Sequence, residues 1–318
     1  MARVDELRLM AKVARMYYIQ ELNQQTITEK LQLHQSTISR MLKKARTMNL
    51  VRFNIATPPG TFAELEDQLT SRFDLRDAVV VDCPAEGDAL VRDLGAALAY
   101  FLETTLKPGK VIGISSWSRS LFAMADALHP GDYCAGGRVV QILGGVGSVG
   151  SAFHAIQLAQ RLAGSIGASP VLLQSPAVVG SPEAQRVLAR DPSVQEASAW
   201  FDKLDLALVG IGSMEPSKML TGSGNVFSRE ERVEMQRRGA VGDICFRFYD
   251  ADGQQIKSPL MKRVIGIDLD RLRTCKRVVG VAGGMQKMQA ILGALRGGLI
   301  DILITDQRTA QALSEAQR

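Results

Sequence analysis

Seven short runs of apolar, largely β-branched residues alternate with helical patterns over most of the 318-residue chain. These runs are apolar on both faces, so each must be covered from two sides. Buried strands that alternate with helices form parallel sheets with helix layers on both faces. We therefore expect a doubly wound, mainly parallel α/β domain with strands at 78–81, 111–114, 139–143, 171–173, 206–211, 278–282 and 300–304.

Composition excludes several classes of protein. With 46% hydrophobic and 22% charged residues, the chain has the balance of a folded protein. No apolar run approaches the roughly 18 residues that a membrane span requires, and the start of the chain is charged instead of showing an apolar signal core. We therefore expect a cytoplasmic protein with no membrane contact.

The cysteines and histidines show no spacing typical of a metal site or of a disulfide framework. They are scattered singly along the chain, as Cys83, Cys134, Cys245, Cys275, His34, His129 and His154. We therefore expect no metal, no cofactor and no disulfide.

The net charge of +5 is distributed unevenly along the chain. Residues 1–56 contain ten Lys or Arg against four Asp or Glu, whereas the remainder contains 28 against 29. The basic excess therefore lies entirely in the first sixth of the sequence. A small basic module joined to a nearly neutral larger one is the charge layout of a nucleic-acid-binding domain attached to something else.

Three helices are predicted in the basic module. Apolar residues at helical spacing indicate a first helix within 5–22, a second over 26–31 and a third from 35 to about 48. About three residues separate the last two, so these helices must cross steeply and the outer face of the third stays free. This is the geometry of a helix-turn-helix. The alternating residues 50–55 could pair after it as a short wing strand, which would make the domain winged.

The free face of the third predicted helix carries short polar groups first and long cations later. Such an order suits a recognition helix, whose first turns meet base edges in the major groove while later Lys and Arg meet phosphates. The alternative is a basic helix face that is simply solvated. The Ser-Thr-Ile-Ser-Arg run at 36–40 resembles the helix-turn-helix of bacterial one-component regulators. The candidate DNA-binding residues are Gln35, Ser36, Thr37, Ser39, Arg40, Lys43, Lys44 and Arg46.

Two prolines and a glycine break the chain after the basic module. The segment Ala56-Thr57-Pro58-Pro59-Gly60 stops both a strand and a helix. We therefore place a DNA-binding domain at 1–56, a linker at 57–60 and a larger domain at 61–318. The helically spaced apolar residues of 62–73 belong either to a connector helix or to the larger domain.

Three loops rich in glycine or serine follow predicted strands, at 115–120, 144–148 and 283–287. Each precedes a predicted helix, and ligands of such sheets bind at the carboxyl ends of the strands. Hydroxyls, open backbone N–H groups and cations at helix starts form an anion site that suits sugar phosphates or polyols. Tight packing explains any single loop equally well, but three converging loops favour a ligand site, which would include Gly144 and Gly145.

Several stretches of the larger domain form a more specific series. They are residues 113–120, residues 239–244, residues 248–250 with Gly253, the Gly-Gly-x-x-Lys pattern from Gly283 to Leu295, and residues 303–306 with Thr309 and Ala310. Together with the basic module, these stretches resemble the SorC family of sugar-binding transcriptional regulators. The resemblance covers both predicted domains in the right order.

The resemblance implies a fold, a ligand class and an assembly for the larger domain. The fold would be related to those of glucosamine-6-phosphate deaminase and ribose-5-phosphate isomerase, and it would bind a sugar, polyol or sugar phosphate in a homo-oligomer, often a tetramer. It assigns a late cation to Lys287 and an acceptor for sugar hydroxyls to Asp243, although a helix cap or a turn acceptor is the alternative for Asp243. The phosphate-loop positions would be Ser116, Ser118, Arg119 and Ser120.

Two departures from the family pattern bear on the ligand. Some relatives have small residues where this chain has Trp117 and Arg119, so the ligand is either phosphorylated or a free sugar or polyol. The strand before Gly144 contains no lysine, which gives no support to covalent capture of an aldehyde sugar from that position. We expect reversible, noncovalent binding.

Three functions remain to be weighed. The first is a regulator of a carbohydrate or polyol catabolic operon, expected to be a repressor. Its affinity for double-stranded operator DNA would change when the effector binds. The second is a sugar-phosphate isomerase or deaminase, since a fold alone does not choose between binding and catalysis. The third is a module that binds RNA or an acidic protein. We expect the first, and no enzyme activity.

Overall fold

The structure is a computed structural model that describes residues 4–51, 58–83, 87–145, 149–215 and 227–317, without the side chains of 149–154. The chain divides into two compact units, Met1–Pro58 and Pro59–Arg318. Within the described residues, no helix is both long enough and apolar enough to cross a membrane. The two units are considered separately.

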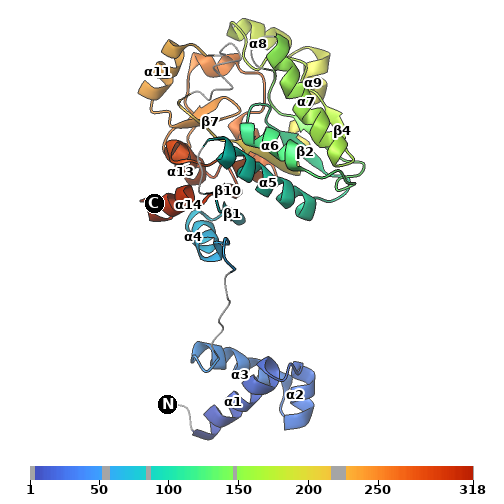
Figure 1. Ribbon diagram of the computed structural model, residues 1–318, viewed down its shortest axis with the longest axis vertical. Helices are drawn as coiled ribbons and strands as arrows, with labels where there is room; N and C mark the ends of the chain where they lie inside the picture. The colour runs from blue at the N-terminus through green and yellow to red at the C-terminus, as the bar shows by residue number, and fades with distance from the viewer. Residues whose placement is uncertain (1–3, 52–57, 84–86, 146–148, 216–226, 318) are drawn as a thin grey trace. The chain divides into compact units, whose positions relative to one another are not determined.

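Three helices form the first unit (Figure 1). They are α1 (Val4–Tyr18), α2 (Gln24–Leu31) and α3 (Gln35–Thr47), and they enclose a small core built around Val13, Ile27, Ile38 and Leu42. The side chain of Asn23 caps α2 by accepting a hydrogen bond from the N–H of Thr26 at 2.8 Å, which starts this helix two residues earlier than expected. The described residues 50 and 51 are not in a strand, and the remainder of the expected wing lies outside the described residues.

A seven-stranded parallel sheet forms the centre of the second unit. Its order is β1-β10-β9-β5-β2-β3-β4, and every neighbouring pair is parallel. All seven expected strands are confirmed. Their bounds are β1 (Asp77–Val81), β2 (Val111–Ile114), β3 (Arg138–Gln141), β4 (Ser169–Val171), β5 (Leu206–Gly210), β9 (Val278–Val281) and β10 (Ile302–Asp306).

Helices cover both faces of this sheet, and strands such as β5 divide their side chains between two hydrophobic cores. In β5, Leu206 and Leu208 enter one core, whereas Ala207 and Val209 enter the other. The first core also contains residues of α5 (Asp88–Thr105), α6 (Arg119–Ala127) and α7 (Val149–Ser165); the second contains residues of α4 (Ala63–Phe73), α13 (Met288–Arg296) and α14 (Gln307–Glu315). The segment 62–73 is thus part of the larger unit.

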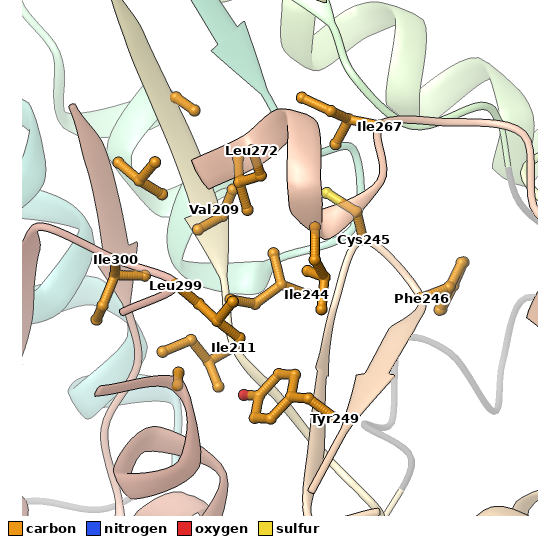
Figure 2. Packing of buried hydrophobic residues seen from close by; sticks show 14 of the residues in the cluster. Val209, Ile211, Ile244, Cys245, Phe246, Tyr249, Ile267, Leu272, Leu299 and Ile300 are labelled. Carbon is orange, nitrogen blue, oxygen red and sulfur yellow. The ribbon is translucent and has the colours of Figure 1, made fainter. Parts of the chain in front are cut away.

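A second, smaller sheet lies beside the carboxyl end of β5. It is antiparallel and consists of β6 (Gly212–Ser213), β7 (Gly242–Ile244) and β8 (Arg247–Tyr249), none of which was expected. Figure 2 shows Ile211, Ile244 and Tyr249 close together in the hydrophobic core behind this sheet. The remaining short helices are α8 (Pro182–Leu188), α9 (Pro192–Ser198), η1 (Phe201–Lys203), α11 (Arg229–Arg237), η2 (Pro259–Arg263), α12 (Leu269–Thr274) and η3 (Met285–Lys287).

The close approach of α5 and α6 predicts a measurable stability effect. A Cβ atom at Gly95 of α5 would lie 2.5 Å from the Cβ of Ala123 and 2.7 Å from backbone atoms of α6. Gly95→Ala should therefore lower the free energy of unfolding by about 1–3 kcal/mol, measured by urea denaturation. Gly164→Ala in α7 is the control, because nothing lies within 4 Å of the added atom; it should raise stability by about 0.5–1 kcal/mol. Equal effects of the two changes would contradict this packing.

Candidate functional site

The outer face of α3 carries all eight candidate DNA-binding residues. Ile38, Leu42 and Ala45 are buried on the opposite face. Of the eight, Thr37 is half-buried; the exposed ones are Gln35, Ser36, Ser39, Arg40, Lys43, Lys44 and Arg46. The polar-then-basic order read from the sequence therefore exists as one continuous surface.

The start of α3 leaves donors available to an anion. Its N-cap residue, His34, makes no side-chain capping bond, and the first turn contains no acidic residue, so its first N–H groups can meet a phosphate. Lys44 is less available than its neighbours, because its ammonium pairs with Glu6 of α1 at 2.5 Å. Arg40 donates from Nε to the carbonyl oxygen of Ser36 at 3.3 Å, which leaves the guanidinium NH1 and NH2 groups to reach outward.

In the second unit, the loops after β2 and β3 meet at the carboxyl ends of these strands. Ser116 donates from Oγ to the carbonyl oxygen of Leu143 at 2.8 Å, and Gly145 donates its N–H to the carbonyl oxygen of Ser175 at 2.8 Å. Gly144 is tightly enclosed, because a Cβ there would lie 2.6 Å from the same Ser175 oxygen. Residues 146–148 of the second loop lie outside the described residues.

Asp243 and Lys287 form an electrostatically coupled pair beside the end of β5. Lys287 donates from Nζ to the carbonyl oxygen of Ile211 at 2.7 Å, and Asp243 lies opposite Gly212 in the small sheet. Burial raises the pKa of Asp243 to about 6, although an N–H donor and the charge of Lys287 act to lower this pKa. Burial lowers the pKa of Lys287, and the Asp243 carboxylate opposes that shift. The pair therefore places a hydrogen-bond acceptor and a cationic donor close together in a buried environment.

A strained hairpin holds Asp243 in place. Cys245 and Phe246, which connect β7 to β8, have φ angles of 52° and 58°, a region that non-glycine residues avoid. The Asp243 carboxylate accepts a hydrogen bond from the N–H of Phe246 at 3.0 Å. Asp243 is thus the turn acceptor considered in the sequence analysis. Only one of its two oxygens has this partner among the described residues, so the other can accept from a ligand.

Arg119 lies at the first position of α6 and forms an ion pair that the sequence analysis did not include. Its guanidinium donates to the carboxylate of Asp88, the first residue of α5. The Asp88 side chain is 82% exposed, so this pair is well solvated. Arg119 is therefore available to an anion only in competition with Asp88. Ser118, the N-cap residue of α6, makes no side-chain capping bond, while Ser120 is buried.

The Gly283–Gly284 turn is explained by packing. Gly284 has a φ angle of 89°, and its N–H donates to the Asp306 carboxylate at 2.7 Å. A Cβ at Gly283 would lie 2.5 Å from the same carboxylate. These glycines allow the turn after β9 to lie close against Asp306 at the end of β10. Of the candidate residues in this loop, only Lys287 lies beside another candidate among the described residues, namely Asp243.

Three polar side-chain atoms near these loops are buried and have no hydrogen-bond partner among the described residues. They are Nε1 of Trp117, Oε1 of Gln141 and Oγ of Ser175. Gln141 is the last residue of β3, and its amide Nε2 donates to the same Leu143 oxygen that accepts from Ser116. Buried polar atoms without a partner are costly, which makes all three candidates for contact with a hydroxylated ligand.

Comparison with known proteins places the chain in a family. The Sugar-bind family, described as a sugar-binding domain, matches residues 57–314. The sorbitol operon regulator of Klebsiella pneumoniae is 32% identical, covering 98% of this chain and 99% of the relative. The chain belongs to the SorC family of sugar-binding transcriptional regulators. The deoxyribonucleoside regulator of Bacillus subtilis (strain 168) is another relative, 31% identical over 97% of this chain and 98% of its own.

The fold agrees with this family. The crystal structure of the full-length sorbitol operon regulator SorC from Klebsiella pneumoniae matches with a TM-score of 0.74 at 30% identity, covering 98% of this chain and all of that chain. A DeoR family transcriptional regulator from Listeria monocytogenes matches 79% of this chain with a TM-score of 0.71 at 27% identity. The mainly parallel α/β architecture expected from the apolar runs is therefore confirmed.

Within this SorC-family chain, the structure adds residues that the sequence analysis missed. Gln141 lies within the strand predicted at 139–143, where a polar side chain among apolar ones was a signal that the sequence offered. Asp88 gave no signal, because its link to Arg119 depends on how α5 and α6 pack. The small sheet that places Asp243 was also missed.

Proposed function

We propose that the chain is a repressor of a carbohydrate or polyol catabolic operon, released from its operator by a sugar-type effector. The observation that carries this proposal is the pairing of an exposed basic helix face in one compact unit with converging polar loops in the other. The relatives' names, sorbitol operon regulator and deoxyribonucleoside regulator, support an operon regulator that responds to a carbohydrate-related ligand.

In this proposal, α2 and α3 act as a helix-turn-helix on double-stranded DNA. Gln32, Leu33 and His34 separate the two helices, and the outer face of α3 enters the major groove. Ser39 and Arg40 reach base edges, whereas Lys43 and Arg46 reach phosphates. The DNA-binding domain, linker and effector domain of this proposal are 1–56, 57–60 and 61–318.

The effector binds noncovalently across the carboxyl ends of β2, β3 and β5. Its hydroxyls bond to Asp243 and to the unpaired atoms of Gln141 and Trp117, and Lys287 provides a cation. An anionic group on the effector displaces Asp88 from Arg119, next to the hydroxyls of the same loop. The family resemblance also implies a relation to sugar-phosphate isomerase and deaminase folds, which agrees with this ligand class. The candidate effector-binding residues remain Ser116, Ser118, Arg119, Ser120, Gly144, Gly145, Asp243 and Lys287.

Assembly provides the coupling between the two sites. The protein works in the cytoplasm as a homo-oligomer, a tetramer, whose subunit arrangement differs between the DNA-bound and effector-bound states. Each ligand then shifts the population toward the arrangement that it prefers. We expect the coupling to be negative, so that binding of the effector lowers the affinity for DNA and releases the operator.

The DNA-binding role predicts different results for two residues of α3. Arg40→Ala should weaken operator binding by about 1–3 kcal/mol and relax specificity at one base pair, because the guanidinium reads a base edge. Lys43→Ala should weaken binding similarly for all sequences and reduce the slope of affinity against salt by about 1. Fluorescence anisotropy with a labelled operator and single-base variants measures both. Unchanged affinity and specificity in Arg40→Ala would remove this residue from the interface.

An isomerase or deaminase activity is the alternative. Asp243 and Lys287 are close enough to influence each other's pKa, as a base and its partner would be. The relatives are named as regulators, however, and catalysis by an isomerase does not require a basic helix face such as that of α3. Turnover of pentose or hexose phosphates by the full chain would favour the enzyme.

A further inference from the structure

A basic cleft lies on the second unit outside the proposed effector site. It consists of two adjoining cavities of about 960 and 490 Å³, which share Arg247, Met261 and Lys262 in their walls. The larger is lined by residues of 254–262 and by two residues of α12, and the smaller by residues of α8, which Figure 1 labels. We refer to these two cavities together as the basic cleft.

Unpaired cations dominate the walls of the basic cleft. Five cationic side chains line it against one carboxylate, that of Asp270. Two of the cations are paired, because Arg186 binds Glu183 at 2.6 Å and Arg273 binds Asp270 at 3.1 Å. The other three, which have no carboxylate within 4 Å in the described part of the chain, are Arg247, Lys257 and Lys262.

Arg247 gives the basic cleft a fixed, buried charge. The residue is only 9% exposed, and its guanidinium donates to the carbonyl oxygens of Met261, Gly266 and Ile267 at 2.8, 3.1 and 3.1 Å. A guanidinium has five N–H donors, so two remain, and the side chain lines both cavities. These carbonyl dipoles and the more distant charge of Asp268, which acts to raise the pKa of Arg247 against the effect of burial, compensate the buried cation only in part.

The walls also fit the organic body of a ligand. Ile256, Pro259 and Met261 provide apolar surface, and the amides of Gln254 and Gln255 can bond to polar substituents. A bare inorganic ion would leave most of the 960 Å³ cavity unused. A phosphate with an organic substituent uses both the cations and the apolar wall.

We propose that the basic cleft binds an organic phosphate, separately from the effector. The phosphate lies against Arg247, Lys257 and Lys262, because an arginine fork flanked by two ammonium groups matches a dianionic tetrahedral group. The organic part lies over Ile256 and Met261.

The basic cleft and the effector loops lie on different sides of one segment, 261–267. Carbonyl groups of this segment accept from Arg247 toward the basic cleft, while the carbonyl of Ile265 accepts from the N–H of Gly144 at 3.1 Å toward the effector loops. No candidate effector residue lines either cavity. The proposal therefore does not depend on the effector assignment.

Phenyl phosphate is a suitable probe, titrated into the full-length protein and followed by ³¹P line broadening and calorimetry. The double variant Lys257→Gln/Lys262→Gln should raise its dissociation constant at least about tenfold. Both lysines are exposed and have no carboxylate within 4 Å among the described residues, so the variant should fold. Lys107→Gln, an exposed lysine outside the basic cleft, and Arg119→Ala should bind phenyl phosphate like the unchanged protein.

Three results would overturn the proposal. One is the absence of binding, and the second is binding that the double variant leaves intact. The third is loss of binding in Arg119→Ala, which would place the probe in the effector site. Light scattering tests whether the basic cleft is instead a contact with a second copy of this chain. That explanation would be favoured if the double variant formed a smaller oligomer but bound phenyl phosphate as the unchanged protein does.

Discussion

Replacing Arg119 with alanine should abolish the response to an anionic effector while leaving operator affinity unchanged. A guanidinium that bonds to an anionic group contributes about 1.5–3 kcal/mol, so the effector's dissociation constant should rise roughly 10- to 150-fold. DNA binding should not change, because the candidate DNA-binding residues lie on α3 in the other compact unit. Calorimetry gives the effector affinity, and anisotropy of a labelled operator gives the DNA affinity.

Two further variants show whether the Arg119 effect comes from the site. Arg161→Ala removes another exposed, ion-paired arginine, bound to Asp126 at 2.5 Å, and should respond like the unchanged protein. Asp88→Asn frees Arg119 from its carboxylate partner and should tighten binding of a phosphorylated effector by up to about fivefold, the worth of an exposed ion pair. A normal effector response in Arg119→Ala would exclude this residue from the site.

Replacing Asp243 with asparagine should weaken effector binding strongly and remove its dependence on pH. An ionised carboxylate accepts hydrogen bonds from hydroxyls more strongly than an amide, so a loss of roughly 10- to 150-fold is expected at pH 8. The pKa of Asp243 is raised to about 6, so its ionised fraction falls as the pH falls through that value. In the unchanged protein, affinity should therefore drop about tenfold per pH unit below 6, whereas the variant should show a flat profile.

Titration calorimetry between pH 5 and 8 checks this result. The asparagine side chain can still accept from the N–H of Phe246, so the strained hairpin should persist. Asp252→Asn is the control, since Asp252 is exposed on the turn after β8 and should leave the pH profile unchanged. Identical pH profiles in the unchanged protein and in Asp243→Asn would mean that another group controls binding.

The main sheet could be predicted because its central strands are buried on both faces. Runs such as 111–114 and 278–281 have no polar face, and that pattern specifies a buried parallel strand almost uniquely when helices intervene. The small sheet could not be predicted. Its strands are two or three residues long, and the hairpin turn of Cys245 and Phe246 lacks the Asn-Gly type of signal that usually marks such a turn.

The sequence was enough to predict which loops and which helix face form the candidate sites. It was not enough to predict the contacts between them. Strand ends followed by serine or glycine mark the loops, and α3 is recognisable because polar and basic residues keep helical spacing on one face. Contacts between distant segments were not readable. The Arg119–Asp88 pair, the orientation of Ser116 toward a carbonyl oxygen and the unpaired Oε1 of Gln141 all depend on packing across the sheet.

The central claim is that a sugar-type ligand binds at the carboxyl ends of the parallel strands, apart from the DNA-binding face. A thermal-shift panel of sugars, polyols and their phosphates tests it most directly, on the unchanged protein, Asp243→Asn and Lys43→Ala. A ligand at 100 times its dissociation constant adds about 2.7 kcal/mol, roughly 5–10 °C for a domain of this size. We expect such a shift in the unchanged protein and in Lys43→Ala, and a shift reduced by about half or more in Asp243→Asn at the same ligand concentration. A shift retained in full by Asp243→Asn, or no shift with any compound, would contradict the account.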